Sequence, residues 1–202
     1  ASQINLGRLY NDDGRHAAAV EYFRTALEIL HRIADGHADV VAYQEHAAGA
    51  SHNIAFALRL DGQLDQALEH AQSAVKRRRR LYEQSGTNAS AESLAESVEL
   101  VAKVHEGRGE IDAAVAARRD LIELRHTLAL QGDATDFQLW QLGAGHLALA
   151  RLTAETGDFS ATENSLQKVI DWLSRGAAAV EGTPEIVLVA RMQRCDALDE
   201  LG

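Results

Sequence analysis

Histidines, a run of cations and two out-of-place arginines are the side chains of this sequence that could do chemistry. Of nine histidines, His37, His46 and His52 gather near Glu45 in one predicted helical region. Metal ligands on one helix face are spaced about four residues apart, whereas these histidines are 9 and 6 residues apart. The sequence also has no phosphate-binding loop, nucleophile elbow or paired His-Glu motif. The pattern predicts no metal, no cofactor and no catalytic site.

Five consecutive cations, Lys76 to Arg80, are similar to a nucleic-acid or localisation patch. They lie in the last turns of a predicted helix, where cations complement the helix dipole. Five consecutive helical residues also point around the whole circumference and so form no single face. The chain carries a net charge of −10, opposite in sign to what a general nucleic-acid binder needs. We therefore interpret the run as structural and expect no nucleic-acid partner.

Two arginines interrupt apolar stripes. Arg118 lies between Val115 and Leu121, where an apolar residue is expected. Its stem is expected to pack while its head reaches water or a neighbouring carboxylate; the alternative is that the head reaches a buried acid. Arg78 shares a repeat position with two leucines and with Arg125. This predicts a position at the edge of the core, where the side-chain stem packs against apolar residues and the guanidinium is exposed to solvent.

The elements that must position these residues recur along the chain. Four turn glycines, each between two helix-period stripes, are spaced by 48, 47 and 48 residues: Gly14, Gly62, Gly109 and Gly157. A second set alternates with them, each placed as a left-handed, helix-ending glycine: Gly36, Gly86, Gly132 and Gly176. Self-similarity of this period predicts stacked helical hairpins rather than one closed globule.

The two glycine sets divide the sequence into nine predicted helices, at about 2–12, 15–35, 38–60, 64–85, 90–107, 111–131, 135–156, 159–175 and 184–201. We expect one all-α array over residues 1–202, with repeats at about 1–36, 37–86, 87–132, 133–176 and a partial one at 177–202. Both ends look like interrupted hairpins, which predicts a piece of a longer array. An apolar face on the last helix could then pair with a copy of itself, through Ile186, Val187, Val189 and Ala190.

Composition agrees with helix packed on helix. Hydrophobic residues make up 46% of the 202 residues and aromatic residues only 5%, so the core must consist of small and aliphatic side chains. The single cysteine, Cys195, fits a reducing compartment. No apolar run reaches the roughly 18 residues of a membrane span. We expect a cytoplasmic location and no membrane partner.

Residues 6–27 resemble the tetratricopeptide repeat. They contain Leu6-Gly7-x-x-Tyr10, then Gly14, then Ala19-x-x-x-Phe23 and Ala26-Leu27. Later repeats keep a small residue in the first helix, at Ala55, Ala102 and Ala150. The family's repeat is about 34 residues long, and the excess here is close to four helical turns. The resemblance implies a long-helix, right-handed solenoid, similar to arrays of bacterial regulators and signalling ATPases.

The resemblance also implies where a ligand would lie, which is against the first helix of each repeat. By the glycine register the inward positions include Leu100, and the expected ligand-binding residues are Asn5, Arg8, His52, Asn53, Phe56, Lys103 and Arg151. Two asparagines stand where the family often bonds a peptide backbone, and an amide both donates and accepts. Three cations at one repeat position would favour acidic peptides or a free carboxylate, although exposed helix faces carry cations in any case.

The sequence therefore favours a non-catalytic scaffold that binds a protein or peptide in a concave face. One alternative is the sensor or autoinhibitory arm of a larger bacterial regulator or signalling ATPase. A distant alternative is a metal-dependent enzyme that uses the histidine-rich third helix.

Overall fold

The computed structural model describes residues 2–36, 40–130, 134–175 and 183–201, and these contain nine helices and no strand. This confirms the all-α prediction over the described residues. His37, Gly132 and Gly176 lie outside them. In chain order the helices are α1 (Ser2–Asp12), α2 (His16–Gly36), α3 (Val41–Leu60), α4 (Leu64–Ser85), α5 (Asn88–Arg108), α6 (Ile111–Leu130), α7 (Asp136–Glu155), α8 (Phe159–Arg175) and α9 (Thr183–Leu201).

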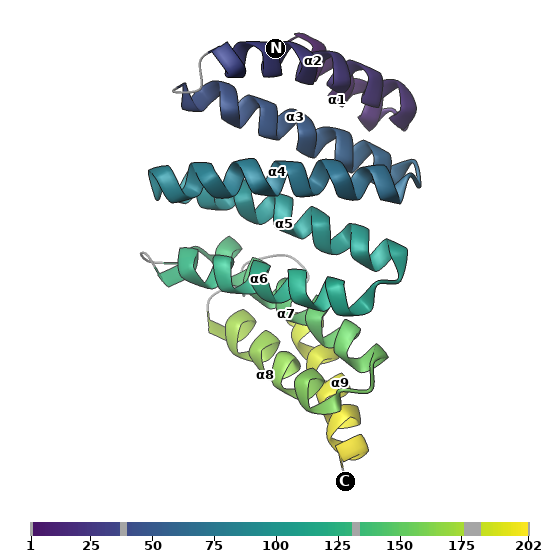
Figure 1. Ribbon diagram of the computed structural model, residues 1–202. Helices are drawn as coiled ribbons and strands as arrows, with labels where there is room; N and C mark the ends of the chain where they lie inside the picture. Colours follow the sequence, from purple (N-terminus) through teal and green to yellow (C-terminus); the bar gives the residue numbers. More distant parts are fainter. Residues whose placement is uncertain (1, 37–39, 131–133, 176–182, 202) are drawn as a thin grey trace. The chain divides into compact units, whose positions relative to one another are not determined.

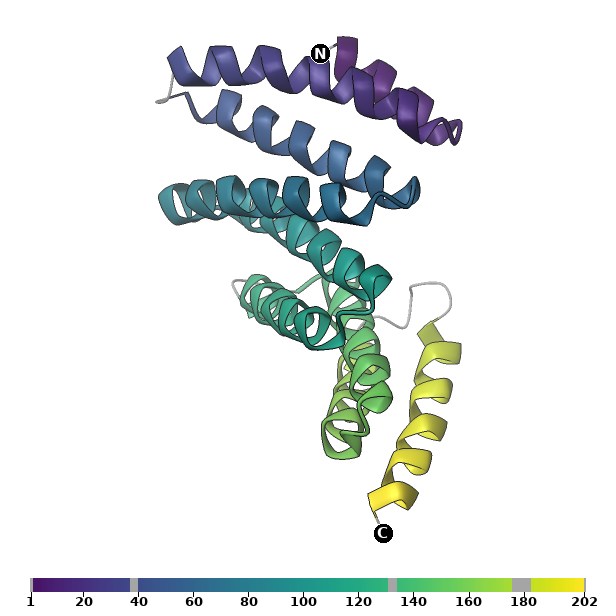
Figure 2. The same cartoon turned by 45° about the vertical axis from the view of Figure 1, so that its right-hand side comes forward.

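The chain forms two compact units, which we call unit 1 (Ala1–Glu110) and unit 2 (Ile111–Gly202). In unit 1, α1 to α5 stack in chain order, each packed on the helix before it (Figure 1). In unit 2, α6 to α9 follow the same rule. The turned view in Figure 2 shows the order of unit 1 again, with α1 and α2 together at the top of the stack and α3, α4 and α5 following below them. Odd-numbered helices are the first of each hairpin, here called helix A, and even-numbered ones are helix B.

The backbone conformation of the turns between helices requires glycine. Gly14, Gly62, Gly109 and Gly157 have φ angles of 74°, 79°, 72° and 74°, in the left-handed region that side chains other than glycine rarely adopt. A Cβ atom at any of the four would meet no atom within 4 Å, so space is not the constraint. In the second glycine set, Gly86 ends α4 with a φ of 59°, as predicted, whereas Gly36 is itself the last residue of α2.

Threonine caps set two helix starts. Thr87 accepts a hydrogen bond from the Ser90 N–H at 3.3 Å, and α5 therefore begins at Asn88, earlier than the predicted 90. Thr135 accepts from the Gln138 N–H at 3.2 Å, while the Gln138 side chain accepts from the Thr135 N–H at 3.0 Å. This reciprocal capping box satisfies donors that the first helical turn leaves unpaired.

Each unit has its own core. In unit 1, Phe23, Ile54 and Leu58 are buried among small side chains of α2 to α5. In unit 2, Leu166, Val169 and Leu173 form the corresponding cluster. Close approach of the helices depends on residues without bulk, because a Cβ built on Gly7 would lie 2.5 Å from Cε1 of the Phe23 ring. The predicted small-residue seam is thus present in the first repeat.

The predicted apolar face of α9 was assigned to the wrong side of the helix. Ala190 is fully buried, and Ile186 and Val187 pack against the unit 2 core, because these positions face α8. Val189 is exposed as predicted, at 44%. The other large exposed side chains of α9 are Leu188, Met192, Leu198 and Leu201.

Candidate functional site

Four of the predicted ligand-binding residues lie together on helices A of unit 1. A cavity of ≈230 Å³, which we call the α1–α3 groove, is lined by Arg8, Asn11, Asp12, Phe23, His52, Asn53 and Phe56. Arg8 and Asp12 are one turn apart on α1, and Asn53 and Phe56 are one turn apart on α3. This spacing places each pair on one helix face. Asp12 was missed in the sequence, although its position four residues after Arg8 was a usable signal.

The groove combines an apolar surface with polar donors and acceptors. The Phe56 ring is 37% exposed, and the Arg59 guanidinium lies 5.4 Å from its centroid. Asn11 Oδ1 is 3.0 Å from His16 Nδ1, which fixes the orientation of the Asn11 amide. Asn53 is half-buried and, as an amide, can both donate to and accept from a peptide backbone. The arrangement suits an extended segment that places an apolar side chain on Phe56.

The remaining predicted residues are placed differently. Asn5 lines a separate cavity of ≈440 Å³ with apolar side chains of α2. Lys103 on α5 is exposed and forms an ion pair with Glu99 at 2.8 Å. Arg151 belongs to unit 2, where it lines a cavity between α7, α8 and α9. Leu100 was expected on the inward face, but it is only 3% exposed, because it joins the unit 1 core.

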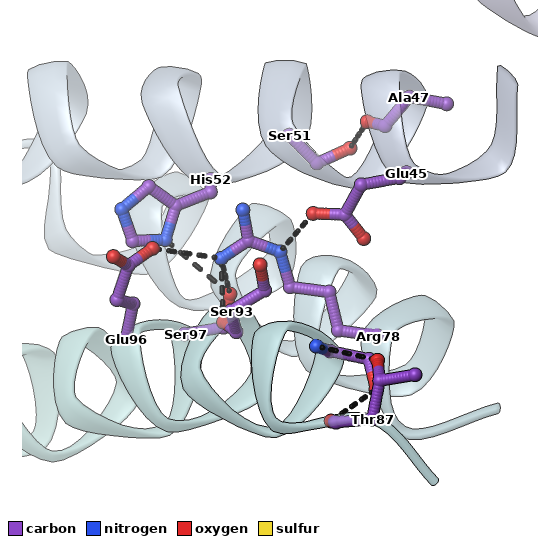
Figure 3. A network of polar contacts seen from close by, with 10 residues as sticks. Glu45, Ala47, Ser51, His52, Arg78, Thr87, Ser93, Glu96 and Ser97 are labelled. Carbon is purple, nitrogen blue, oxygen red and sulfur yellow. Dashed lines mark hydrogen bonds and ion pairs between the residues drawn. The ribbon is translucent and has the colours of Figure 1, made fainter. Parts of the chain in front are cut away.

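A polar network behind the groove fixes the position of His52 (Figure 3). Arg78 on α4 extends between α3 and α5, where Nη1 donates to the Ser93 carbonyl at 2.6 Å and to Ser97 Oγ at 3.0 Å. Its Nε forms an ion pair with Glu45 Oε1 at 3.3 Å. Ser97 Oγ in turn lies 3.3 Å from His52 Nδ1. A guanidinium can only donate hydrogen bonds, so Ser97 Oγ accepts from Arg78. The Ser97 hydroxyl proton then remains free to be donated to Nδ1 of a neutral His52 ring.

This network corrects the prediction for Arg78. Its side chain is 7% exposed, so the guanidinium is not exposed to solvent but is bound to protein groups of two neighbouring helices. Arg125, at the same position one repeat later, is 9% exposed and donates from Nη1 to the Gln141 carbonyl at 3.2 Å. Arg118 is 6% exposed, so little of it meets bulk water, and the other expectation, that its head pairs with a neighbouring carboxylate, stays a prediction. The sequence marked these arginines as unusual but did not show their burial.

Burial, reinforced by the positive charges of Arg78 and Lys103, lowers the pKa of His52 from 6.5 to about 4. The folded chain therefore holds His52 neutral, while the unfolded chain takes up a proton near pH 6.5. In the window between these values the unfolded state binds more protons, so folding stability falls as the pH is lowered.

We expect the free energy of unfolding to fall by about 2 kcal/mol from His52 alone between pH 7 and pH 5. Urea unfolding at both pH values measures it, and His52→Asn should reduce the loss by that amount. His146 in unit 2, whose pKa burial lowers to about 4, keeps part of the acid sensitivity in this variant. His46→Asn, at an exposed position of the same helix, is the control. An unchanged pH dependence in His52→Asn contradicts the prediction.

The part of the chain that the structure describes contains neither a metal-binding cluster of side chains nor a membrane-spanning helix. No group of three or more His, Cys, Asp or Glu side chains there is arranged to hold a metal ion. None of the described helices combines the length and apolar character needed to cross a bilayer.

Comparison with known proteins connects this fold to a family. The sequence profile of the tetratricopeptide repeat matches residues 1–39 and 47–86. Comparison with the curated proteins gives no match. BtubC (BKLC) from P. vanneervenii is similar in structure, with a TM-score of 0.67 at 18% identity. That similarity covers 89% of this chain and 63% of BtubC, so the chain spans less than two thirds of that protein's length.

A putative kinesin light chain from Podosopora anserina, with nearly identical TPR-like repeats, is also similar. Its TM-score is 0.64 at 19% identity, over 99% of this chain and 90% of that one. Identities this low establish the fold alone, whereas the profile match and the Gly7–Phe23 seam carry the family's own sequence pattern. Residues 1–39 and 47–86 therefore carry the sequence signature of the tetratricopeptide repeat, and the later helices continue the same helical-hairpin fold.

Proposed function

We propose that this chain is a non-catalytic scaffold that holds an extended protein segment in the α1–α3 groove. Tetratricopeptide repeats generally mediate protein–protein interaction, which sets the class of partner. The observation that carries the proposal is that Arg8, Asn53 and Phe56 line one cavity on consecutive helices A. Together they offer a cation, a backbone-bonding amide and an apolar surface, which is what an extended segment with varied side chains requires.

The charge of the groove favours a segment with an acidic group near Arg8. Arg8 is exposed, and no ion pair to it occurs among the described residues. The Lys103 ammonium, by contrast, is already paired with Glu99, so Lys103 is a secondary contributor to our proposal. Asp12 at the groove wall limits how many acidic groups the ligand can carry, because a carboxylate close to it would be repelled.

Selection of peptides from a displayed library of random linear peptides tests the groove directly. We expect the selected peptides to bind Arg8→Glu/Asn53→Ala at least about tenfold more weakly than the wild type. The control is Arg119→Glu/Asn164→Ala, which makes the same two changes at exposed positions of α6 and α8. Peptides that bind the groove variant and the wild type equally well would show that another face is used.

A further inference from the structure

The basic run on α4 forms a second candidate site, on the other helix of the hairpin. Lys76, Arg77 and Arg80 line a cavity of ≈440 Å³ together with Gln44, Ser73, Leu81 and Gln84. Residues 73, 77, 80 and 84 follow the 3–4 spacing of one helix face. The five cations do point around the helix, as the sequence indicated, but three of them open into the same space.

The helix dipole does not explain these cations. Helix α4 continues to Ser85, and its last turn contains no basic residue. The stabilising effect of the dipole falls off within the last turn, so Lys76 and Arg77 lie too far from the helix end to benefit. That part of the sequence interpretation is wrong, and the cluster needs another reason.

The cluster also has no internal counter-charge. No residue that lines the cavity is acidic, and no carboxylate among the described residues forms an ion pair with Lys76, Arg77 or Arg80. Other cations of this chain are paired, as Arg108 is with Asp65 and Glu110. Like charges that share a cavity repel one another, and an anion bound among them would relieve that repulsion.

The walls are preorganised to donate hydrogen bonds. The Arg77 guanidinium is held by Gln44 Oε1 at 3.2 Å and by His31 Nε2 at 3.1 Å. Two bonds from its Nη atoms fix the plane of this guanidinium, so less side-chain entropy is lost when it binds a ligand. Arg80 and Lys76 are exposed at the rim and add charge that an incoming anion meets first.

From this geometry we propose that the cavity binds a small phosphorylated metabolite through its phosphate groups. Arginine forks match phosphate oxygens in a bidentate manner, and the resulting bonds are charge-assisted. The volume of ≈440 Å³ falls within the range of small-molecule sites, about 300–1,000 Å³. A nucleic-acid strand would instead need a longer track of cations, and the exposed Glu69 and Glu83 of α4 limit the positive surface along the helix.

Titration calorimetry of the whole chain with inorganic pyrophosphate tests phosphate recognition. We expect a Kd below about 1 mM for the wild type. Arg80→Gln and Lys76→Gln should each weaken binding by about tenfold, because each removes one charge from the cavity. Arg79→Gln is the matched control, since Arg79 is exposed, belongs to the same run and does not line the cavity. Its affinity should stay within about twofold of the wild type.

Two further ligands, ADP and a phosphoserine peptide, distinguish a free metabolite from a phosphorylated protein as the source of the phosphate group. ADP should bind at least as tightly as pyrophosphate, because the cavity also offers Leu81 to an organic group. The proposal is overturned if pyrophosphate does not bind in the millimolar range, or if Arg79→Gln weakens binding as much as Arg80→Gln. A phosphoserine peptide that binds more than about tenfold tighter than both would overturn the assignment to a free metabolite. The groove variant Arg8→Glu/Asn53→Ala should bind pyrophosphate normally, so this site stands or fails separately from the groove.

Discussion

Replacing Arg78 with methionine is expected to lower the free energy of unfolding by about 3 kcal/mol. Methionine keeps most of the stem's volume but removes the guanidinium that bonds the Ser93 carbonyl and Ser97. Ser97 is fully buried, so water cannot easily replace the lost donor. Glu45 and Glu96 are 36% and 66% exposed and can be rehydrated, which keeps the cost below that of a fully buried ion pair.

A matched control separates this network from the charge alone. Arg79→Met makes the same change on the adjacent, exposed residue, and its effect should stay within about 0.5 kcal/mol. Urea unfolding measures both variants. If Arg78→Met is as stable as the wild type, the desolvation of the guanidinium cancels its bonds, and the network does not stabilise the fold.

The histidine beside Arg78 gives a second readout of the same variant. The positive charge of Arg78 contributes to the lowered pKa of His52, although burial is the larger cause. Arg78→Met should therefore raise the pKa of His52, which an NMR titration of the imidazole measures, whereas Arg79→Met should leave it unchanged. Looser packing around His52 would also raise this pKa, because it reduces the desolvation that is the larger cause of the lowering. Arg78→Lys, which keeps the positive charge, separates the two causes: loss of the charge predicts a smaller rise in Arg78→Lys than in Arg78→Met.

The repeat spacing predicted the helices because each turn between two helices of a hairpin requires a glycine for its backbone conformation. A left-handed φ at Gly14, Gly62, Gly109 and Gly157 restricts these positions to glycine, and the spacing between them is visible without coordinates. The small-residue seam was also predictable, since Gly7 and Phe23 belong to a known sequence pattern. Signals of this kind depend on single residues and their spacing.

The candidate site was only partly predictable, because a cavity depends on how neighbouring helices pack. Asn5 and Arg8 are one turn apart on α1, yet they line different cavities, with different side chains of α2 and α3 opposite them. Leu100 has a helical position equivalent to that of Asn53, but it is drawn into the core. The register gives a residue's direction around its own helix and not what faces it.

The same limit explains the arginines on helices B. The register placed Arg78 and Arg125 at one repeat position, between leucines in the outer repeats. It could not show that a backbone carbonyl of the next helix A, Ser93 or Gln141, would accept from each guanidinium. A carbonyl oxygen has two lone pairs and can accept a second bond while it remains in the helix. The recurrence in both units indicates that this contact is a repeated feature of the fold.

Replacing Gly143 with alanine is expected to destabilise unit 2 by about 1–3 kcal/mol, although alanine is the better helix former by about 1 kcal/mol. A Cβ at this position of α7 would lie 2.5 Å from Cδ2 and 2.6 Å from Cγ of Leu173. Leu173 is 1% exposed and packed within the unit 2 core, so it cannot move aside without displacing its neighbours. Thermal or urea unfolding measures the loss.

Gly49→Ala is the matched control for this close-packing argument, because it makes the same substitution within another helix A. The nearest atom to a Cβ at Gly49 is Arg78 Nη2 at 3.9 Å, an ordinary van der Waals distance, so the gain in helix propensity should prevail and stabilise the fold by about 0.5–1 kcal/mol. Adding Leu173→Ala to Gly143→Ala should cost less than the sum of the two single changes, since each relieves the other's misfit. Additive costs, or stabilisation by Gly143→Ala, would mean that α7 and α8 have room to separate. The close approach of these two helices would then not depend on a glycine at position 143.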